Sequence, residues 1–290
     1  MRGTLRVSRG DGPLRVEHDR LVRDALVRGA PISRDESRSL ADGHDPAVVA
    51  AAIRTWRGRM LHEHLSAAVF SRLLPQLIEA EAAVDVKMCV LRMAMDELHH
   101  SMLCAEVVRG LGGEPAAPAE LATEPLPAHD GVSPRERALR NVLFVGCLSE
   151  TVALAMLSEE HELATEPFVK RVLAQLVADE LTHAKLGWSY VAETWPTLDA
   201  AARTRTAAYL PVALAHLATK WAELIRAAGT SSLELDAGLR ALGITPARDA
   251  HELFDATLRT AILPRFAEMG LAPSTPAGAT LAELTARRTE

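Results

Sequence analysis

The 290-residue chain contains few of the residues that could tie a fold together covalently. Its three cysteines, Cys89, Cys104 and Cys147, lie in apolar stretches and form no C-x-x-C pair. This pattern argues against a disulfide framework and against a structural zinc site, and it favours a reducing compartment.

Long apolar runs and a strong charge excess are also lacking. No stretch reaches 18 uninterrupted apolar residues, which is the length typical of a membrane-spanning helix. The first residues lead into no apolar segment of the kind found in signal peptides. The net charge of −6 and the pI of about 6.0 give no general preference for nucleic acid or for an anionic membrane. We therefore expect a soluble, cytoplasmic protein that binds neither.

A short motif, D-E-L-x-H, occurs twice, at residues 96–100 and 179–183. The two copies lie 83 positions apart. Each places a glutamate three residues before a histidine, so that both side chains lie on one helix face about one turn apart. Two such faces, joined by two more carboxylates, form the ligand set of a dinuclear iron or manganese site in a four-helix bundle.

Two glutamates supply the missing carboxylates. Glu63 lies 34 residues before Glu97, and Glu150 lies 30 residues before Glu180. The near-equal gaps suit two antiparallel helix pairs joined by short turns. Charged residues in such apolar stretches need partners or metals when they are buried. The candidate metal ligands are Glu63, Glu97, His100, Glu150, Glu180 and His183.

Capping residues and helix breakers predict the rest of the fold. Four long helices, each about 42 Å in length, are expected over 46–74, 84–111, 133–164 and 165–195. Pro75 is expected to disturb the end of the first helix. A Pro-rich crossover over 114–132, too rich in proline for an ordered element, separates the second helix from the third. A bundle with one long crossover at this place has the ferritin-like connection.

The predicted fold class is therefore all-α, a ferritin-like four-helix bundle with additional C-terminal helices. We expect an irregular N-terminal arm over 1–44, the bundle over 45–195, and accessory helices over 196–290 that pack on the bundle within the same domain. A short helix is expected near 18–28. The accessory helices are expected near 198–228, 233–242 and 247–269, with a kink at Pro264, followed by a weak helix in the tail 271–290.

These residues resemble the ferritin-like di-iron carboxylate superfamily over about residues 45–195. The resemblance implies two iron ions, or manganese or a mixed pair, with Glu97 and Glu150 as candidates for bridging carboxylates. In the hydroxylase components of bacterial multicomponent monooxygenases, the aspartate of this motif orients a ligand histidine. Asp96 and Asp179 are similar in position. The alternative is that each aspartate is exposed on the flank of its helix.

Three positions test the resemblance more finely. The monooxygenase hydroxylases carry a cysteine at the position of Cys104. Ribonucleotide reductase small subunits carry a radical-forming tyrosine there, so the cysteine argues against a tyrosyl-radical generator. Leu154 stands where the hydroxylases carry threonine. Leu176 stands where the p-aminobenzoate N-oxygenase type carries an additional ligand histidine. The chain therefore matches the full residue pattern of neither subfamily.

Small and apolar residues near the ligands could form a pocket for O₂ or for part of a substrate. The small candidates are Cys104, Gly146, Cys147 and Ala153. The apolar candidates are Met60, Ala67, Phe70, Met93 and Ala94. The alternatives are close helix packing for the small residues and ordinary core packing for the apolar ones.

The sequence predicts an O₂-dependent di-iron oxygenase or oxidase that acts on a small molecule by hydroxylation, N-oxygenation or a related oxidation. No flavin or iron–sulfur signature is visible, so electrons would come from an external donor or reductase. Two alternatives remain: a non-enzymatic, iron-handling protein of the ferritin-like type, and a helical protein that binds no metal. A homodimer is also possible on the sequence alone. An open, substrate-sized cavity beside the metals would favour the enzyme.

Overall fold

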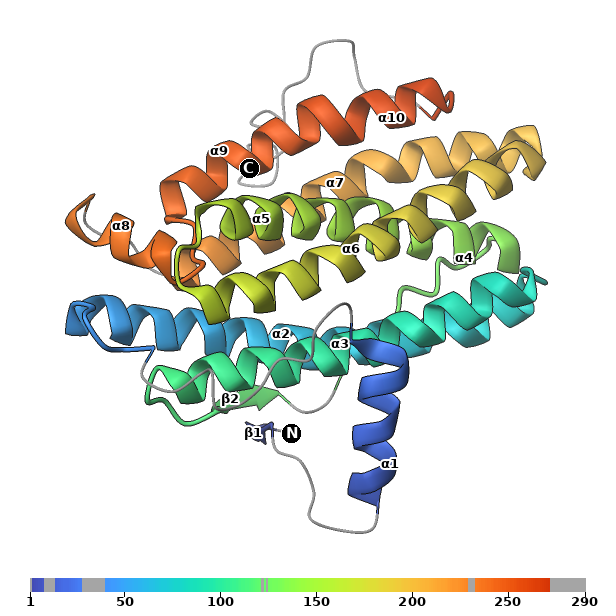
Figure 1. Cartoon of the computed structure of the whole chain (residues 1–290). Coiled ribbons are helices and arrows are strands. Elements are labelled where there is room, and N and C mark those ends of the chain that lie inside the picture. The colour runs from blue at the N-terminus through green and yellow to red at the C-terminus, as the bar shows by residue number, and fades with distance from the viewer. Residues whose placement is uncertain are drawn as a thin grey trace.

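The structure is a computed structural model that describes residues 2–7, 14–27, 40–120, 123, 125–228 and 233–271. The described chain is almost wholly helical (Figure 1). The bundle consists of α2 (Pro46–Glu79), α3 (Val84–Gly110), α6 (Pro167–Thr194) and one composite helix made of α4 (Pro134–Val142), the π-helical turn η3 (Leu143–Ser149) and α5 (Glu150–Leu163). A long crossover joins α3 to α4. The predicted all-α bundle with this connection is confirmed.

The starts of three bundle helices follow from their capping residues. The side chains of Asp45, Ser133 and Glu166 each accept a hydrogen bond from a backbone N–H two or three residues later, at 2.6, 3.2 and 2.9 Å. A proline follows each cap, where its missing N–H costs no helical hydrogen bond. These local signals fix where each helix begins.

The prediction that Pro75 disturbs the end of the first helix is wrong, because α2 continues through it to Glu79. A proline inside a helix costs about 3 kcal/mol or more. Leu73 and Leu77, on either side of the proline, are both buried in the bundle core. This packing stabilises the last helical turns despite the proline.

The crossover and the start of the N-terminal arm contain strands that the sequence did not predict. Strand β2 (Ala116–Glu120) lies in the crossover and pairs antiparallel with β1 (Arg2–Arg6), with Pro118 opposite Thr4. A two-stranded sheet has only edge strands, where proline is tolerated. The arm also forms α1 (Leu14–Leu21) and the π-helical turn η1 (Val22–Leu26), which together correspond to the short helix predicted near 18–28 but begin four residues earlier. With β1, these elements show that the described part of the arm is not irregular.

The C-terminal helices form a further layer on the bundle. Figure 1 shows α7 (Ala200–Ala228), α9 (Ala247–Thr257) and α10 (Leu263–Glu268) above α5 and α6, which in turn lie above α2 and α3. The short elements are η4 (Trp195–Thr197), α8 (Leu233–Ala241) and η5 (Leu258–Ile262). The π-helical turn η5 interrupts the helix predicted over 247–269 just before Pro264. The tail helix predicted within 271–290 lies outside the described residues, apart from Leu271.

Among the described residues, the composite helix Pro134–Leu163 is long and apolar enough to cross a membrane by length and composition alone. Of its most apolar window, 61% is buried inside the protein, as in the core helix of a bundle. This helix contributes to a core of two hydrophobic clusters. Phe70 and Met93 belong to one, and Met60 and Cys104 belong to the other. The predicted metal ligands lie on the helices between them.

Candidate metal centre

The structure brings all six candidate ligands together in the middle of the bundle. Each of the four bundle helices contributes, and every one of these residues is at most 8% exposed. The ligands are Glu63 from α2, Glu97 and His100 from α3, Glu150 from the first position of α5, and Glu180 and His183 from α6.

The six residues form two overlapping groups. Glu63 and His100 belong to one group, Glu150 and His183 belong to the other, and Glu97 and Glu180 belong to both. Within each group of four, the potential ligand atoms lie within 4.8 Å of one another. The shared carboxylates are thus those of the two repeated motifs. The resemblance pointed to Glu97 and Glu150 as bridges, whereas the geometry places Glu150 in one group only.

The inward-facing ring nitrogens have the geometry of metal ligands. Nδ1 of His100 lies 3.4 Å from Oε2 of Glu63, and Nδ1 of His183 lies 3.3 Å from Oε1 of Glu97. These two nitrogens and Oε2 of Glu180 are buried and form no hydrogen bond. Buried polar atoms seldom lack a partner. A donor set of four carboxylates and two imidazoles suits a pair of divalent transition-metal ions, so the residues fit the group that the resemblance implies.

The outward-facing ring nitrogens are held by aspartates in a crossed arrangement. Nε2 of His100 lies 3.2 Å from Oδ2 of Asp179, and Nε2 of His183 lies 3.4 Å from Oδ2 of Asp96. Each aspartate therefore supports the histidine of the other motif. Both aspartates are buried, which rules out the exposed-flank alternative. Such a carboxylate fixes the tautomer and the orientation of a ligand histidine.

A second pair of residues supports the two aspartates. Arg92 donates from Nε to Oδ1 of Asp96 at 2.7 Å, and Gln175 donates from Nε2 to Oδ2 of Asp179 at 2.5 Å. Gln175 also donates to the backbone oxygen of Leu26 in η1 at 3.2 Å. Sequence reasoning missed this pair, although these residues are also 83 positions apart and each precedes its aspartate by four residues. The repeat thus extends one helical turn beyond the motif.

The electrostatics of the cluster reflect four carboxylates packed together. Burial opposes the charged form of Glu63, but the charge of the adjacent His100, 3.4 Å away, outweighs it and lowers the pKa of Glu63 to about 2. Burial also opposes the charged form of His100, yet Asp179 and Glu63 raise its pKa to about 10. Burial raises the pKa of Glu97 well above its usual range. The cluster therefore needs positive charge, which protons or metal ions can supply.

The helix that carries Glu150 is distorted just before this ligand. The π-helical turn η3 ends at Ser149, one residue before Glu150. Within it, Gly146 touches Gly187 of α6 so closely that a Cβ added to Gly146 would lie 2.7 Å from the Cα of Gly187. Single π-helical turns are frequent at functional sites. Gly146 therefore serves close helix packing, one of the two roles that its small size suggested.

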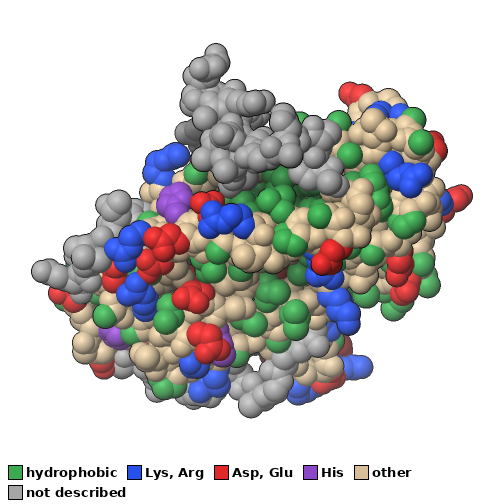
Figure 2. All heavy atoms as spheres, turned by 90° about the horizontal axis from the view of Figure 1, so that it is seen from above, with side chains coloured by type: hydrophobic (Ala, Val, Ile, Leu, Met, Phe, Trp, Pro, Cys, Tyr) green, Lys and Arg blue, Asp and Glu red, His purple; other side chains and the backbone are tan. Residues whose placement is uncertain are grey.

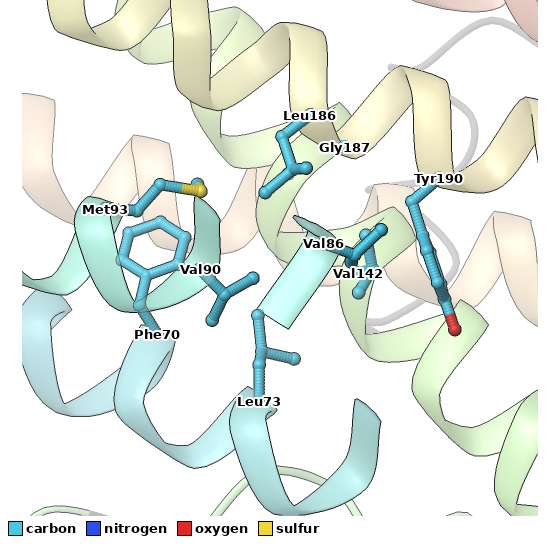
Figure 3. Close-up of a pocket in the computed structure, with 10 residues that line it drawn as sticks. Phe70, Leu73, Val86, Val90, Met93, Val142, Leu186, Gly187 and Tyr190 are labelled. Atoms are coloured by element: carbon cyan, nitrogen blue, oxygen red, sulfur yellow. The ribbon is translucent and has the colours of Figure 1, made fainter. Parts of the chain in front are cut away.

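A small apolar cavity with about 10 Å³ of free space, room for a single water molecule, lies beside Phe70 and Met93. Met93 lies four residues before Glu97, and the Phe70 ring centroid is 5.7 Å from that of His183, so this end adjoins the ligands. Figure 3 shows Phe70 and Met93 on one side of the cavity and Tyr190 on the other. The lining residues are Phe70, Leu73, Val86, Val90, Met93, Val142, Gly146, Leu186, Gly187 and Tyr190.

The pocket candidates from the sequence divide into two sets. Gly146, together with Phe70 and Met93, lines this cavity. Cys104, Cys147 and Ala153 do not line it. Cys104 packs in the hydrophobic cluster that contains Met60, Cys147 is buried in the other cluster, and Ala153 is half-buried. Sequence reasoning also missed residues such as Val142 and Tyr190, which lie about two helical turns from the ligands on the same side.

Comparisons with known proteins agree with this geometry. A family model described as p-aminobenzoate N-oxygenase AurF matches residues 67–241. A solved structure described as protein 19 with aldehyde deformylating oxidase activity, from Synechococcus, is similar with a TM-score of 0.53 and 14% sequence identity. The similarity covers 84% of this chain and 98% of that chain, and at this identity it shows the fold alone. No curated protein matches the chain.

Proposed function

Because the chain belongs to the p-aminobenzoate N-oxygenase AurF family, and is therefore a di-iron oxidoreductase with a ferritin-like fold, we propose that its six clustered residues hold two iron ions. The observation that carries this proposal is the pair of overlapping groups in the bundle core. Glu97 and Glu180 would bridge the ions, Glu63 and His100 would complete one site, and the remaining glutamate and histidine would complete the other. Four carboxylates would balance the charge of two divalent ions.

The iron pair would supply the redox chemistry with O₂ as co-substrate. The protein's own part is positioning and shielding. Asp179 and Asp96 hold the outer ring nitrogens of the two ligand histidines. This places the proton on each outer nitrogen and leaves the inner nitrogen free to bind a metal ion. Phe70 and Met93 are buried, and Phe70 packs against His183, so they separate the ligands from bulk water on this side.

Membership of the family supports a small-molecule substrate. The cavity beside Phe70 has room for about one water molecule and is lined by none of the six ligands, so it does not separate an oxygenase from an iron-handling protein. On the basis of the family, we favour O₂-dependent oxidation of a small molecule by hydroxylation, N-oxygenation or a related reaction. An external electron donor or reductase, a manganese or mixed-metal form, and the soluble, cytoplasmic location remain predictions.

The chain departs from the p-aminobenzoate N-oxygenase type at one ligand position. Leu176, where that type carries an additional histidine, is fully buried in a hydrophobic cluster. The ligand set proposed for this chain therefore has one histidine for each metal ion. The motif ligands of the two halves are then related by the 83-residue offset, whereas Glu63 and Glu150 lie 87 residues apart.

Anaerobic titration with Fe(II) tests the proposal. The wild-type chain should bind two iron ions, one for each group of ligands, and should then consume O₂. His183→Ala should lose at least one ion, whereas His251→Ala, which removes an exposed histidine of α9, should bind as much iron as the wild type. Equal iron binding by wild type and His183→Ala would refute the ligand assignment.

A further inference from the structure

The outer side of α3 is covered along only part of the helix. Every residue over 99–108 is buried except Met102. The first half of the helix carries a row of exposed apolar side chains instead, spaced by four, three and seven residues, so that they share one face. This row, the α3 stripe, has the spacing that receives another helix. Its residues are Val84, Met88, Leu91 and Leu98.

The helix α1 gains no burial from the rest of the described chain. It is eight residues long, none of them is buried, and Leu14 is 80% exposed. Figure 1 shows α1 projecting from the bundle beneath α3, on the side away from α9 and α10. So short a helix has little stability of its own in water, and the exposed ion pair between Arg15 and Asp19, at 3.8 Å, adds little. Contact with a second molecule would stabilise it.

The place where α1 leaves the bundle is fixed by η1, which continues α1 and contacts α3. The turn ends at buried Leu26, whose backbone oxygen accepts a hydrogen bond from Gln175. Gln175 also donates to Asp179, which holds His100. Leu26 therefore lies close to His100, two residues beyond Leu98, and α1 projects from this end of the α3 stripe.

The opposite end of the stripe adjoins the turn between α2 and α3, which is also apolar and exposed. Val84 and Leu98 are 14 residues apart, or about 21 Å along the helix. The eight residues of α1 span only about 12 Å, so α1 does not reach the turn of its own chain. If that turn is to receive α1, the helix must come from another copy.

Two-fold symmetry brings these two ends together. In a two-fold dimer each surface meets its own copy. When two α3 stripes pack antiparallel, Leu98 of one copy lies beside the partner's Val84, and Leu91 lies near the symmetry axis. The α1 helix then lies beside the partner's turn between α2 and α3. A parallel arrangement would leave both turns exposed, whereas the antiparallel one covers both the turns and the α1 helices.

We propose that α1 is an arm that completes an antiparallel two-fold dimer of this chain by packing on the partner's turn between α2 and α3. Leu14 and Leu21, which are exposed and seven residues apart on one face of α1, make this contact. The inference goes beyond the proposed function and does not depend on the metal ions. The exposed apolar residues at the receiving turn are Ile78, Val84 and Met88.

Crosslinking between copies tests the contact. Full chains that carry Cys89→Ser are co-expressed in pairs with different affinity tags, one with Leu21→Cys and the other with Met88→Cys, and treated with a short bismaleimide. The main product should be a crosslinked dimer that holds one copy of each variant. Val212→Cys, at an exposed position on α7, replaces Met88→Cys in the control pair and should give no such dimer.

Charges introduced into the arm provide a second test. The double variant Leu14→Glu, Leu21→Glu should dimerise about 10-fold more weakly or worse, because two apolar contacts are lost and two charges would be buried at the interface. The double variant Val212→Glu, Leu224→Glu adds the same charges to exposed positions of α7 and should dimerise like the wild type. Sedimentation equilibrium measures the dissociation constants.

Three results would overturn the inference. A wild type that stays monomeric would show that the occupant of the stripe is not a second copy. Crosslinks that join two copies of Leu21→Cys, but not Leu21→Cys to Met88→Cys, would show a parallel arrangement. Equal dissociation constants for the two double glutamate variants would show that α1 takes no part in the dimer. None of these results depends on iron, so the proposed function is tested separately.

Discussion

At the scale of single residues, the crossed aspartates connect the two halves of the metal centre. Asp179 belongs to the motif on α6 but holds His100 of α3, and Asp96 does the reverse for His183. Each histidine therefore depends on a helix other than its own for its orientation. The support also differs chemically, because Asp96 pairs with the cation Arg92 whereas Asp179 accepts from a neutral amide.

Replacing Asp179 tests this arrangement. Asp179→Asn should weaken iron binding about 10- to 100-fold, because the amide no longer provides a charged acceptor for His100. The group of ligands that contains His100 should lose affinity for iron first. At intermediate Fe(II) concentrations, the other group should therefore still hold an ion. Anaerobic titration measures both effects.

Asp255→Asn is the matched control, since Asp255 is exposed on α9, which carries none of the six ligands. It should leave the iron titration unchanged. If Asp179→Asn bound iron as tightly as this control, the crossed support would have no role in metal binding.

Much of the site could be predicted from the sequence because the repeat is local. A Glu and a His three residues apart must share a helix face, so the motifs alone identify four ligands. Which carboxylates are shared depends on how the helices face one another, and the sequence does not encode that locally. The resemblance suggested Glu97 and Glu150 as candidates for the bridges, whereas the two groups of ligand atoms share Glu97 and Glu180.

At the scale of elements, a glycine contact sets how closely η3 approaches α6. A Cβ added to Gly187 would lie 2.4 Å from the carbonyl carbon of Gly146. No side chain fits there without moving one of the two backbones. This contact lies within one helical turn of Glu150 and His183, so it also sets the distance between their helices.

Gly187→Ala should therefore lower the free energy of unfolding by about 1–3 kcal/mol and reduce iron binding, because η3 and α6 must separate. Gly58→Ala adds the same methyl group to α2, where no atom lies within 4 Å of the added Cβ. This control should gain up to about 1 kcal/mol from its higher helix propensity. Denaturant unfolding measures both variants, and equal stabilities would contradict the account of the contact.

The N-terminal arm is joined to the metal centre through one side chain. Gln175→Ala removes the hydrogen bonds to Asp179 and to the backbone of Leu26. We expect faster amide exchange in η1 together with weaker iron binding, since both partners lose support. Thr182→Ala, which removes only a hydrogen bond to the backbone of its own helix, is the control. Unchanged exchange in η1 would show that Gln175 does not hold the arm.

The element boundaries show where prediction from sequence stops. Caps such as Asp45 and Ser133 act locally, and they placed the helix starts correctly. The continuation of α2 past Pro75 and the strand at Ala116–Glu120 depend on distant partners, namely the core around Leu77 and the strand β1. The π-helical turn η3 likewise reflects contact with α6 and has no local sequence signature.

At the scale of the whole molecule, one exposed apolar stripe stands out on α3. Val84, Met88, Leu91 and Leu98 are 44–70% exposed, with half-buried Met95 between the last two. Their alternating spacing of four and three residues is that of a coiled-coil seam, which is complementary to a second copy of itself. Figure 2 shows the face around the C-terminal helices, where acidic and basic side chains are interspersed toward the edges and hydrophobic side chains lie between them.

We therefore expect a homodimer that is joined through this stripe. The double variant Met88→Glu, Leu91→Glu should be monomeric in sedimentation at concentrations where the wild type is dimeric. Val212→Glu, at a 63% exposed position on α7, should stay dimeric. Cys89, beside the stripe, is exposed whereas Cys104 and Cys147 are buried, so mild oxidation should crosslink the dimer through Cys89. A monomeric wild type would contradict this interface.

The most direct test of the account is a crystal structure of the Fe(II)-loaded protein, with anomalous diffraction recorded at the iron absorption edge. We predict two iron peaks for each chain, one in each ligand group, with carboxylate oxygens of Glu97 and Glu180 between them. Absence of iron from this cluster, a single peak, or peaks elsewhere in the bundle would contradict the proposed di-iron centre.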